Sequence, residues 1–442
     1  MGNALITDLY ELKMASSYLQ RGMVGPATFS LFVRRLPTNR GFLVAAGLED
    51  CLRYLESFAF STEDLDWLEN AGFPVDVIER FSALRFTGDV HAVPEGRVVL
   101  ANEPLLEVTA PIAEAQLVET YLLNQVTFQT ALATKATRCR LAAGDIELVD
   151  FALRRTHGTE AGMAVARVSA IAGFVGSSNV EAARRFGLQA AGTMAHSYIE
   201  AFPTEAEAFR AFAEDVPGPI TFLVDTYDTL EGVKTAAAVI RDLGLTGSVG
   251  VRLDSGNLAQ LARETRRLLD DVDLSEVRIF VSGGLDEYDL ERFRVNHVPI
   301  DAAGVGTRLG VSTDAPSLDS AYKLVAFEER PVLKLSVAKA TLPGAKQVWR
   351  RLPFDEDVLA TRNEPGPTGF EPLLVPVMRG GCRVEPPDTI EAARLRLTRD
   401  LDGLPPAARV LRAPTVPGVA VSERLRLLTD YVTAGVRNVN DG

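Results

Sequence analysis

The chain has 442 residues, of which 47% are apolar and 24% charged, so it can form a large core and is long enough for two or three domains. Its net charge of −13 argues against a general nucleic-acid binder or a protein that binds anionic membranes, because both need a basic face. Its three cysteines are widely spaced and fit neither a disulfide framework nor a zinc site. We find no signal-peptide pattern and no apolar run of membrane-spanning length, and we therefore expect a cytoplasmic protein.

The first 143 residues predict an α+β domain. Asp8 and Glu11 have the spacing of a capping box, which indicates that a helix begins there. Residues 81–110 contain short runs of Val and Leu broken by Gly and Pro, a pattern typical of strands. Residues 111–144 show a helical pattern that is long enough for two helices. Helices and strands in this irregular order favour an α+β arrangement.

From residue 144 to 318, short apolar segments alternate with amphipathic helical segments. The apolar segments predict strands at 147–153, 171–175, 188–192, 219–225, 248–253, 277–282 and 300–304. Strands that are separated by helices run parallel to one another. Six or seven such units in a row favour an irregular or incomplete parallel (β/α) barrel. A doubly wound open sheet is the alternative.

The alternation stops after residue 318. Segments 322–327 and 331–336 predict antiparallel strands, and one helix is predicted near 389–400. This Pro- and Arg-rich part has too few apolar residues for a core of its own, so we expect residues 319–442 to pack on the N-terminal domain. The expected fold class is α/β: an incomplete parallel barrel with an α+β domain formed from the N-terminal and C-terminal segments. The expected domains are 1–143, 144–318 and 319–442.

Polar residues and glycines follow each predicted strand of the barrel, where ligands of parallel barrels bind. In chain order they are Phe151, Arg154 and Arg155; Asn179; Thr193, His196 and Ser197; Asp225; Arg252 and Asp254; Ser282, Gly283 and Gly284; Gly304, Gly306 and Thr307. His196 is one of only four histidines and lies in a turn of small residues. We expect these residues to converge on one rim of the barrel.

Each of these groups suits a different part of a ligand. Adjacent arginines bind carboxylate or phosphate oxygens, and acids such as Asp225 suit sugar hydroxyls or Mg²⁺. The glycine turns of the last two units expose backbone N–H groups, as phosphate sites do. Plainer interpretations exist: a solvated arginine pair, an N-cap for Asn179, and a loop histidine bonded to backbone for His196. The whole set favours a phosphorylated sugar that meets a flat anionic base.

Several motifs resemble the nicotinate phosphoribosyltransferase family. They are Thr7-Asp8-Leu9-Tyr10-Glu11-Leu12, Arg40-Gly41-Phe42-Leu43-Val44-Ala45-Ala46-Gly47-Leu48, Leu153-Arg154-Arg155, Gly192-Thr193-Met194-Ala195-His196-Ser197, Arg252-Leu253-Asp254-Ser255-Gly256 and Gly304-Val305-Gly306-Thr307. The resemblance implies a cytoplasmic enzyme of NAD salvage that makes nicotinate mononucleotide and pyrophosphate from nicotinate and phosphoribosyl pyrophosphate. It also implies Mg²⁺, and ATP as a co-substrate that is hydrolysed through a phosphohistidine.

The resemblance assigns roles residue by residue. His196 matches the phosphorylated histidine, and Tyr10 matches the aromatic residue that reaches the base from the partner subunit of a homodimer. Phe151, Thr193 and Arg252 match contacts to the base. The remaining matches are Arg154 and Arg155 for base and phosphates, Asp254 for ribose or metal, and Gly283, Gly284, Gly304 and Thr307 for the phosphoribosyl group. Catalytic roles fall to His196, Arg252 and Asp254, and the metal ligands are left unassigned.

Three positions bear on the substrate. Asn179 stands where a nicotinamide-using relative has an aspartate, and a neutral side chain suits an acid substrate because an aspartate would repel its carboxylate. Thr156-His157 replaces the Ala-Gln that usually follows the arginine pair of the family, and Arg308 replaces a small or apolar residue.

Other functions are open at this stage. A related transferase would use nicotinamide or quinolinate, and quinolinate would need a further basic contact, which Arg155 could supply. A non-catalytic sensor of phosphoribosyl pyrophosphate would have lost the histidine or the acids, whereas His196, Asp225 and Asp254 are all present. A barrel aldolase would need a Schiff-base lysine, and no lysine stands at the strand ends named above.

Overall fold

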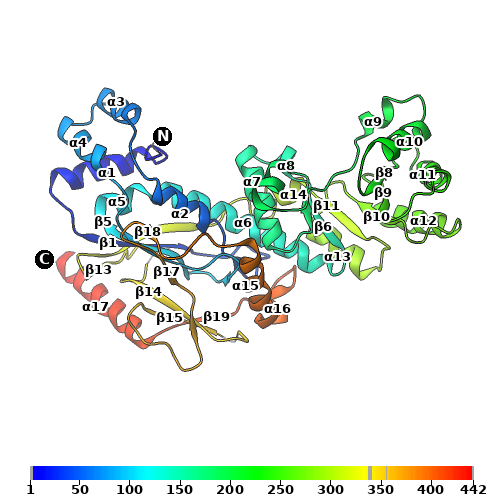
Figure 1. The fold of residues 1–442 in the computed structure, drawn as a ribbon. Coiled ribbons are helices and arrows are strands. Elements are labelled where there is room, and N and C mark those ends of the chain that lie inside the picture. Colours follow the sequence, from blue (N-terminus) through cyan, green and yellow to red (C-terminus); the bar gives the residue numbers. More distant parts are fainter. Residues whose placement is uncertain (1–2, 337–340, 355, 441–442) are drawn as a thin grey trace. The chain divides into compact units, whose positions relative to one another are not determined.

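The computed structural model describes residues 3–336, 341–354 and 356–440 (Figure 1). The chain forms two compact units. The first unit consists of Met1–Thr134 and Asp314–Gly442, and the second consists of Lys135–Thr313. Helix α6, Glu119–Ala143, crosses the first of these boundaries. The division therefore lies inside a helix, whereas the sequence prediction placed it after residue 143.

The first unit combines helices and antiparallel sheets from both ends of the chain. Its helices are α1 Leu9–Gln20, α2 Leu48–Glu56, α3 Thr62–Asn70, α4 Val75–Ala83, α5 Ile112–Leu117, the start of α6, α15 Ile390–Gly403, α16 Pro406–Arg409 and α17 Glu423–Asn440. Its strands are β1 Pro26–Val33, β2 Leu43–Val44, β3 Asp89–Ala92, β4 Val98–Val99, β5 Pro104–Pro111, β12 Ser320–Phe327, β13 Arg330–Pro331, β14 Lys346–Arg350, β15 Glu356–Thr361, β16 Glu371–Pro372, β17 Val375–Arg379, β18 Cys382–Arg383 and β19 Gly418–Val421.

The main sheet of the first unit has the strand order β13-β12-β1-β5-β3-β17-β18. Strands β12 and β17 come from the C-terminal segment and pair with β1 and β3 of the N-terminal segment. A second sheet, β16-β14-β15-β19, comes entirely from the C-terminal segment. The expectation of an α+β domain formed from both ends of the chain is confirmed.

A buried ionic network joins the two segments of this unit. Asp400 of α15 accepts hydrogen bonds from Arg97 Nε at 2.9 Å and from Arg350 Nη1 at 3.2 Å. Arg350 is fully buried, bonds to Asp357 with Nε at 3.0 Å, and donates to the carbonyl of Val98 at 2.6 Å. Buried charges are tolerated only when they are paired in this way, so the network ties α15 and β14 to β4.

Three predictions in this unit are wrong in detail. The strand expected at 331–336 ends at Pro331, because Val332–Ser336 form no ladder. The described residues of the C-terminal part contain three helices, α15, α16 and α17, where one was expected. The capping box is absent: Asp8 is the N-cap of α1 but makes no side-chain cap bond, and the Glu11 carboxyl bonds instead to Thr7 and Thr120.

The second unit is built on a parallel sheet. Its strands are β6 Glu147–Asp150, β7 Gly176–Ser177, β8 Ile220–Leu223, β9 Val249–Leu253, β10 Arg278–Val281 and β11 Ala302–Val305. Its helices are the end of α6, the 3₁₀ turn η1 Leu153–Arg155, α7 Thr159–Ile171, α8 Val180–Phe186, α9 His196–Glu200, α10 Glu205–Asp215, α11 Thr229–Leu243, α12 Leu258–Asp270, α13 Glu287–Val295 and α14 Thr307–Gly310. The strand order is β7-β6-β11-β10-β9-β8.

Strand β6 is the first strand of this sheet in the chain and β11 is the last, and the two pair with each other. The sheet therefore curls toward a barrel, and the barrel is incomplete between β7 and β8. The segment 188–192, predicted as a full strand, contributes a single bridge between Ala190 and Ser177. The strand predicted at 171–175 is instead the end of α7 and a turn at Gly173, whose φ of +93° suits glycine, and the strand itself is Gly176–Ser177.

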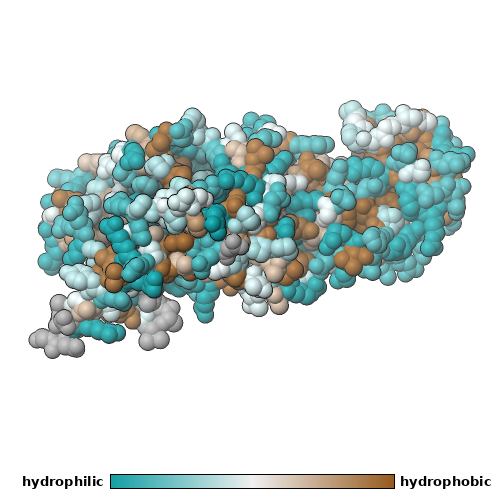
Figure 2. Space-filling view, turned by 90° about the horizontal axis from the view of Figure 1, so that it is seen from below, coloured by the Kyte–Doolittle hydropathy of each residue, from teal (hydrophilic) through white to brown (hydrophobic). Residues whose placement is uncertain are grey.

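No helix of the described residues is long and apolar enough to cross a membrane. On the face of the molecule that Figure 2 shows, hydrophilic residues predominate and hydrophobic residues lie in scattered groups.

Candidate functional site

Arg252 is the centre of a hydrogen-bonded cluster at the carboxyl end of β9. Its guanidinium donates to Ser282 Oγ at 2.7 Å, to Thr193 Oγ1 at 2.9 Å and to Asp254 Oδ1 at 2.6 Å. These partners come from the ends of β9 and β10 and from the segment after the bridge at Ala190, so they hold the planar group in one orientation. Nη2 donates one N–H to Asp254, which leaves its second N–H for a ligand.

An aromatic surface lies beside this guanidinium. The carbon Cζ of Arg252 is 5.4 Å from the centre of the Phe151 ring, and the Phe151 ring stacks on Phe280 with centroids 5.5 Å apart. A Cβ atom added at Gly304 would lie 2.6 Å from Phe151 Cδ2. Only glycine therefore leaves room for this ring. The buried carboxyl of Asp150, which accepts from the backbone N–H of Ala152 at 2.8 Å, shapes the turn that carries Phe151.

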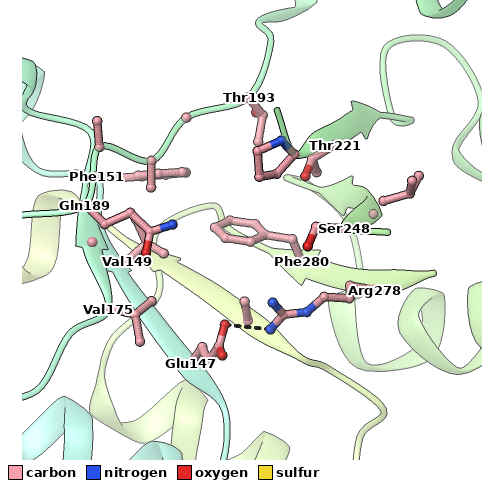
Figure 3. Close-up of a pocket in the computed structure, with 18 of the residues that line it drawn as sticks. Glu147, Val149, Phe151, Val175, Gln189, Thr193, Thr221, Ser248, Arg278 and Phe280 are labelled. Atoms are coloured by element: carbon pink, nitrogen blue, oxygen red, sulfur yellow. Dashed lines mark hydrogen bonds and ion pairs between the residues drawn. The ribbon is translucent and has the colours of Figure 1, made fainter. Parts of the chain in front are cut away.

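A cavity of about 200 Å³ lies among the strands beneath this aromatic pair (Figure 3). Phe151, Phe280 and Thr193 line one part of it, and the ion pair between Glu147 and Arg278 lines another. Figure 3 shows the Gln189 side chain pointing into the cavity toward the Phe280 ring. The cavity therefore has an aromatic part and a polar part.

His196 begins α9 on the same rim as Arg252. Its ring nitrogen Nδ1 is 3.1 Å from Thr226 Oγ1, which follows β8. The plainer interpretation, a loop histidine bonded to backbone, is therefore wrong for Nδ1, because its partner is a side chain. The charge of His196 is one of the influences on the Asp254 carboxyl, which places the two groups near each other.

Two acids of the rim are held in different ways. Burial is the largest influence on the pKa of Asp254 and raises it, but the bonds and charge of Ser282 and Arg252 outweigh burial and leave that pKa below its ordinary value. Asp225 Oδ2 accepts from the backbone N–H of Asp254 at 3.0 Å and from Ser255 Oγ at 2.6 Å. Asp225 Oδ1 is buried and has no hydrogen-bond partner among the described residues.

A third carboxyl, Glu205 of α10, faces Asp225 and Asp228. Its pKa is raised to about 7 by burial first and then by the charges of these two aspartates. Its Oε1 is also buried without a hydrogen-bond partner in the part of the chain that is described. Among the described residues, no group of three or more His, Cys, Asp or Glu could hold a metal ion by itself.

Gly283 and Gly284 follow β10, and Gly306 follows β11, as the sequence predicted, whereas Gly304 lies inside β11, where it pairs with Val149. Gly283 has a φ of +104°, and a Cβ atom there would lie 2.1 Å from the carbonyl oxygen of Asp254. Gly284 also has a positive φ. Thr307 is exposed at the start of α14, after Gly306. Arg308 bonds to Asp286 of the neighbouring loop, so this departure from the family pattern ties the two turns together.

Other predicted residues have different surroundings. Arg154 and Arg155 are exposed and make no ion pair within the described parts of the chain. Ser197 is exposed on α9. Asn179 is buried: its side chain caps α8 by accepting from the N–H of Ala182 at 3.1 Å, and its amide nitrogen contacts Met163 Sδ. The plainer interpretation of Asn179 as an N-cap is confirmed. Tyr10 belongs to the first unit, on α1.

The sequence analysis missed Thr226, Phe280, Gln189 and Glu205 as members of this site. Thr226 stands one residue after Asp225 and was within reach of the same reasoning. Phe280 alternates with buried Ile279 and Val281 along β10, a period that places it on the inner face. Gln189 and Glu205 carry no local signal, because only the curvature of the sheet directs them toward the rim.

The fold and this rim define an α/β protein with a hydrogen-bonded arginine cluster at the strand ends of an incomplete barrel. The sequence matches the nicotinate phosphoribosyltransferase (NAPRTase) N-terminal domain over residues 5–127 and the NAPRTase family over residues 146–340. The chain therefore belongs to the nicotinate phosphoribosyltransferase family.

Individual relatives agree with this assignment. The chain is 46% identical over 430 residues to nicotinate phosphoribosyltransferase pncB2 of Mycobacterium tuberculosis, with 96% of this chain and 92% of that protein covered. It is 42% identical over 357 residues to the Bacillus subtilis nicotinate phosphoribosyltransferase, with 78% and 73% covered. Human nicotinic acid phosphoribosyltransferase has a similar structure, with a TM-score of 0.86 at 30% identity over 96% of this chain and 99% of that chain. Nicotinate-nucleotide pyrophosphorylase from Pyrococcus furiosus follows with a TM-score of 0.76 at 26% identity over 90% and 95%.

Proposed function

We propose that this protein is a cytoplasmic nicotinate phosphoribosyltransferase of NAD salvage. It joins nicotinate to the ribose of phosphoribosyl pyrophosphate and releases pyrophosphate. The observation that carries the proposal is the Arg252 guanidinium, fixed by three side chains beside the Phe151 ring. A flat aromatic acid satisfies both groups at once, since its ring stacks on Phe151 and its carboxylate accepts from Arg252.

The reaction needs little proton transfer. The bond between ribose C1′ and the pyrophosphate oxygen breaks, and the pyrophosphate leaves with the electron pair. The pyridine nitrogen of nicotinate then forms the new bond to C1′, and it is already a nucleophile at neutral pH. The residues of the chain act by alignment and by charge: Phe151 and Arg252 orient the ring, and the glycine turns at Gly283 and Gly306 bind phosphate oxygens with backbone N–H groups.

The residues of this rim fit Mg²⁺, which would be bound by protein and substrate together. Asp225 offers a buried carboxylate oxygen without a partner, and Mg²⁺ is commonly bound by one or two carboxylates together with substrate phosphates. We assign Asp225 to hold it, because the Oδ1 of Asp254 is already committed to Arg252 and Ser282. The bound ion supplies charge neutralisation for the departing pyrophosphate.

His196 is proposed to couple ATP hydrolysis to the transfer. The γ-phosphoryl group of ATP passes to a ring nitrogen of His196 and ADP leaves; water later takes the phosphoryl group as phosphate. The Thr226 hydroxyl fixes the orientation of the ring. The added phosphoryl charge lies on the same rim as the pyrophosphate site and changes the affinity for substrate and product.

The proposed homodimer has support on α1. Leu9, Tyr10 and Met14 of α1 are exposed at 50%, 46% and 36%, with Tyr10 and Met14 four residues apart on the helix, and Ile6 before the helix is 54% exposed. Exposed apolar side chains in one row suit an interface with a second subunit. This row carries Tyr10, which the family resemblance places against the base of the partner subunit.

One assay tests the function. Pyrophosphate release is measured with nicotinate, nicotinamide and quinolinate in parallel, each with and without ATP. We expect release with nicotinate and stimulation by ATP. Incubation with γ-labelled ATP is expected to label the wild type and leave His196→Ala unlabelled. Equal labelling of both proteins contradicts the phosphohistidine, and preference for another base contradicts the substrate.

A second candidate substrate is quinolinate. Its additional carboxylate needs a further cation, and the exposed, unpaired guanidiniums of Arg154 and Arg155 are available for one. If quinolinate is the substrate, Arg155→Gln lowers activity with quinolinate more than activity with nicotinate. If Arg155→Gln lowers activity with nicotinate more than activity with quinolinate, quinolinate is excluded as the substrate.

A further inference from the structure

Arg308 is a charged residue where the family pattern has a small or apolar side chain, and the reaction proposed above gives it no role. It is the second residue of α14, directly after Gly306 and Thr307. Its Nη1 bonds to Asp286 and lies 3.5 Å from Asp289 Oδ2. Both aspartates belong to the segment that follows β10. Arg308 therefore connects the last two strand-end loops of the second unit.

The backbone pairing between these loops ends before their glycine turns. The ladder between β10 and β11 stops at the pair Val281 and Ala303. Gly283 and Gly306 lie beyond this pair, and glycine is the residue with the greatest backbone freedom. The distance between the two turns is therefore set by side chains of neighbouring residues.

Both turns offer backbone N–H groups to a ligand. Within the described parts of the chain, no acceptor is bonded to the backbone N–H groups of Gly283, Gly284, Gly306 and Thr307. Free N–H groups in glycine turns bind phosphate oxygens. Two turns can hold one phosphorylated ligand together only if the distance between them matches it.

The loop after β10 supplies a fixed anchor for Arg308. Asp286 is the N-cap of α13, and its Oδ1 accepts from two backbone N–H groups of the first turn at 2.9 and 3.1 Å. The next residue, Glu287, is fully buried and bonds to Lys135 and to Arg138 Nε, the latter at 3.1 Å. The carboxylate of Asp286 is thus held in place, and its bond to Arg308 extends this restraint to the last loop.

We infer that Arg308 is a positioning residue that sets the spacing of the two phosphate-binding turns and thereby the affinity for phosphoribosyl pyrophosphate. This inference rests on the proposed function and deepens it. Arg308 is not a catalytic residue, because it acts through the turns. A small or apolar residue at this position cannot form the ion pair with Asp286.

The expected effect concerns the ligand more than the stability of the fold. The side chain of Arg308 is 46% exposed and that of Asp286 is 13% exposed. Ion pairs with such exposure contribute little to stability. Breaking this pair is therefore expected to change ligand affinity while the melting temperature stays close to that of the wild type.

The test compares the full-length wild type with Arg308→Met, which keeps an aliphatic side chain and removes the guanidinium. We expect the KM for phosphoribosyl pyrophosphate to rise about threefold to tenfold, with kcat within about twofold of the wild type. Arg308→Lys restores part of the affinity, because its ammonium can still pair with Asp286. An unchanged KM in Arg308→Met overturns the inference.

Asp286→Asn breaks the same pair from the other side. Asparagine is a good N-cap, so α13 keeps its cap. If the pair acts as one unit, Asp286→Asn raises this KM as much as Arg308→Met does, and the double variant is no worse than either single variant. Effects that multiply in the double variant show that the two residues act independently, and they overturn the inference.

Arg292→Met is the matched control. Arg292 pairs with Asp289 of its own helix, its side chain is 64% exposed, and it bonds to no other loop among the described residues. We expect its KM for phosphoribosyl pyrophosphate to equal that of the wild type. A rise as large as that of Arg308→Met overturns the inference, because any lost charge near α13 would then have the same effect.

Calorimetric titration with phosphoribosyl pyrophosphate in the absence of a base provides a readout that does not need turnover. We expect the Kd to rise about threefold to tenfold in Arg308→Met and in Asp286→Asn, and to stay unchanged in Arg292→Met. Equal Kd values in all four proteins, or no binding by the wild type, overturn the inference. If no base supports pyrophosphate release, the proposed transfer fails, and this titration still decides the role of Arg308 separately.

Discussion

Arg252→Lys is the substitution that tests the base site most directly. The guanidinium is held by Thr193, Asp254 and Ser282 at 2.9, 2.6 and 2.7 Å, and its side chain is 11% exposed. A lysine keeps the positive charge but has no planar fork, so it cannot meet three partners and a ligand at once. Loss of a charge-assisted hydrogen bond to a charged group costs about 1.5–3 kcal/mol. We therefore expect kcat/KM for nicotinate to fall roughly 10- to 150-fold.

The assay is initial-rate pyrophosphate release at saturating phosphoribosyl pyrophosphate with varied nicotinate. Arg210→Lys is the matched control, because Arg210 is an exposed arginine of the same unit that pairs with Asp242 and does not line the cavity. We expect this control to stay within about twofold of the wild type, as surface ion pairs contribute little. A kcat/KM for Arg252→Lys within the range of the control refutes the assignment of the carboxylate to Arg252.

Three further predictions concern space and charge. In Gly304→Ala the new methyl group displaces the Phe151 ring, so the KM for nicotinate rises while circular dichroism stays native; an unchanged KM contradicts the stacking role. In Gly283→Ala the methyl group meets the Asp254 carbonyl, and the residue must keep a φ of +104°, so we expect the free energy of unfolding to fall by about 1–3 kcal/mol in thermal unfolding. A melting temperature equal to that of the wild type contradicts this prediction. For Glu11 the folded-state pKa of about 7 is above the unfolded value, so its stabilising contribution is complete at low pH and is lost as the pH rises through about 7. We therefore expect Glu11→Gln to raise the melting temperature relative to the wild type more at pH 8 than at pH 4. Equal shifts at both pH values argue against this linkage.

The gap in the barrel has a direct consequence for the site. Only a single bridge at Ala190, with backbone bonds of Gln189 and Ala191 to Ser177, joins the predicted third strand to a neighbour, so the chain from Gly192 to Ala195 runs free of the sheet. Thr193 reaches Arg252 from this free segment, and His196 begins its helix immediately afterwards. A regular strand here would direct alternate side chains inward and outward and would separate these contacts.

Much of the fold followed from the sequence because the apolar periods are strong. The amphipathic segment between the strands predicted at 248–253 and 277–282 forms helix α12, Leu258–Asp270, and the region 111–144 forms two helices as expected. The prediction of a full strand at 188–192 was wrong for a physical reason. Four of its five residues are small or apolar, which suits a strand, but a strand also needs partners on its edges, and pairing depends on the rest of the sheet.

The amino-acid sequence by itself determined the alternation of strands and helices, the order of the strand-end residues and the family to which they belong. Only the tertiary structure decided what each polar group is bonded to. It placed Asn179 in a helix cap and left Arg154 exposed. It also bonded Glu11 to threonine hydroxyls, whereas the sequence had predicted a capping box between Glu11 and Asp8. The reason is that hydrogen bonds and desolvation depend on neighbours distant along the chain, whereas periodicity and turn chemistry are local.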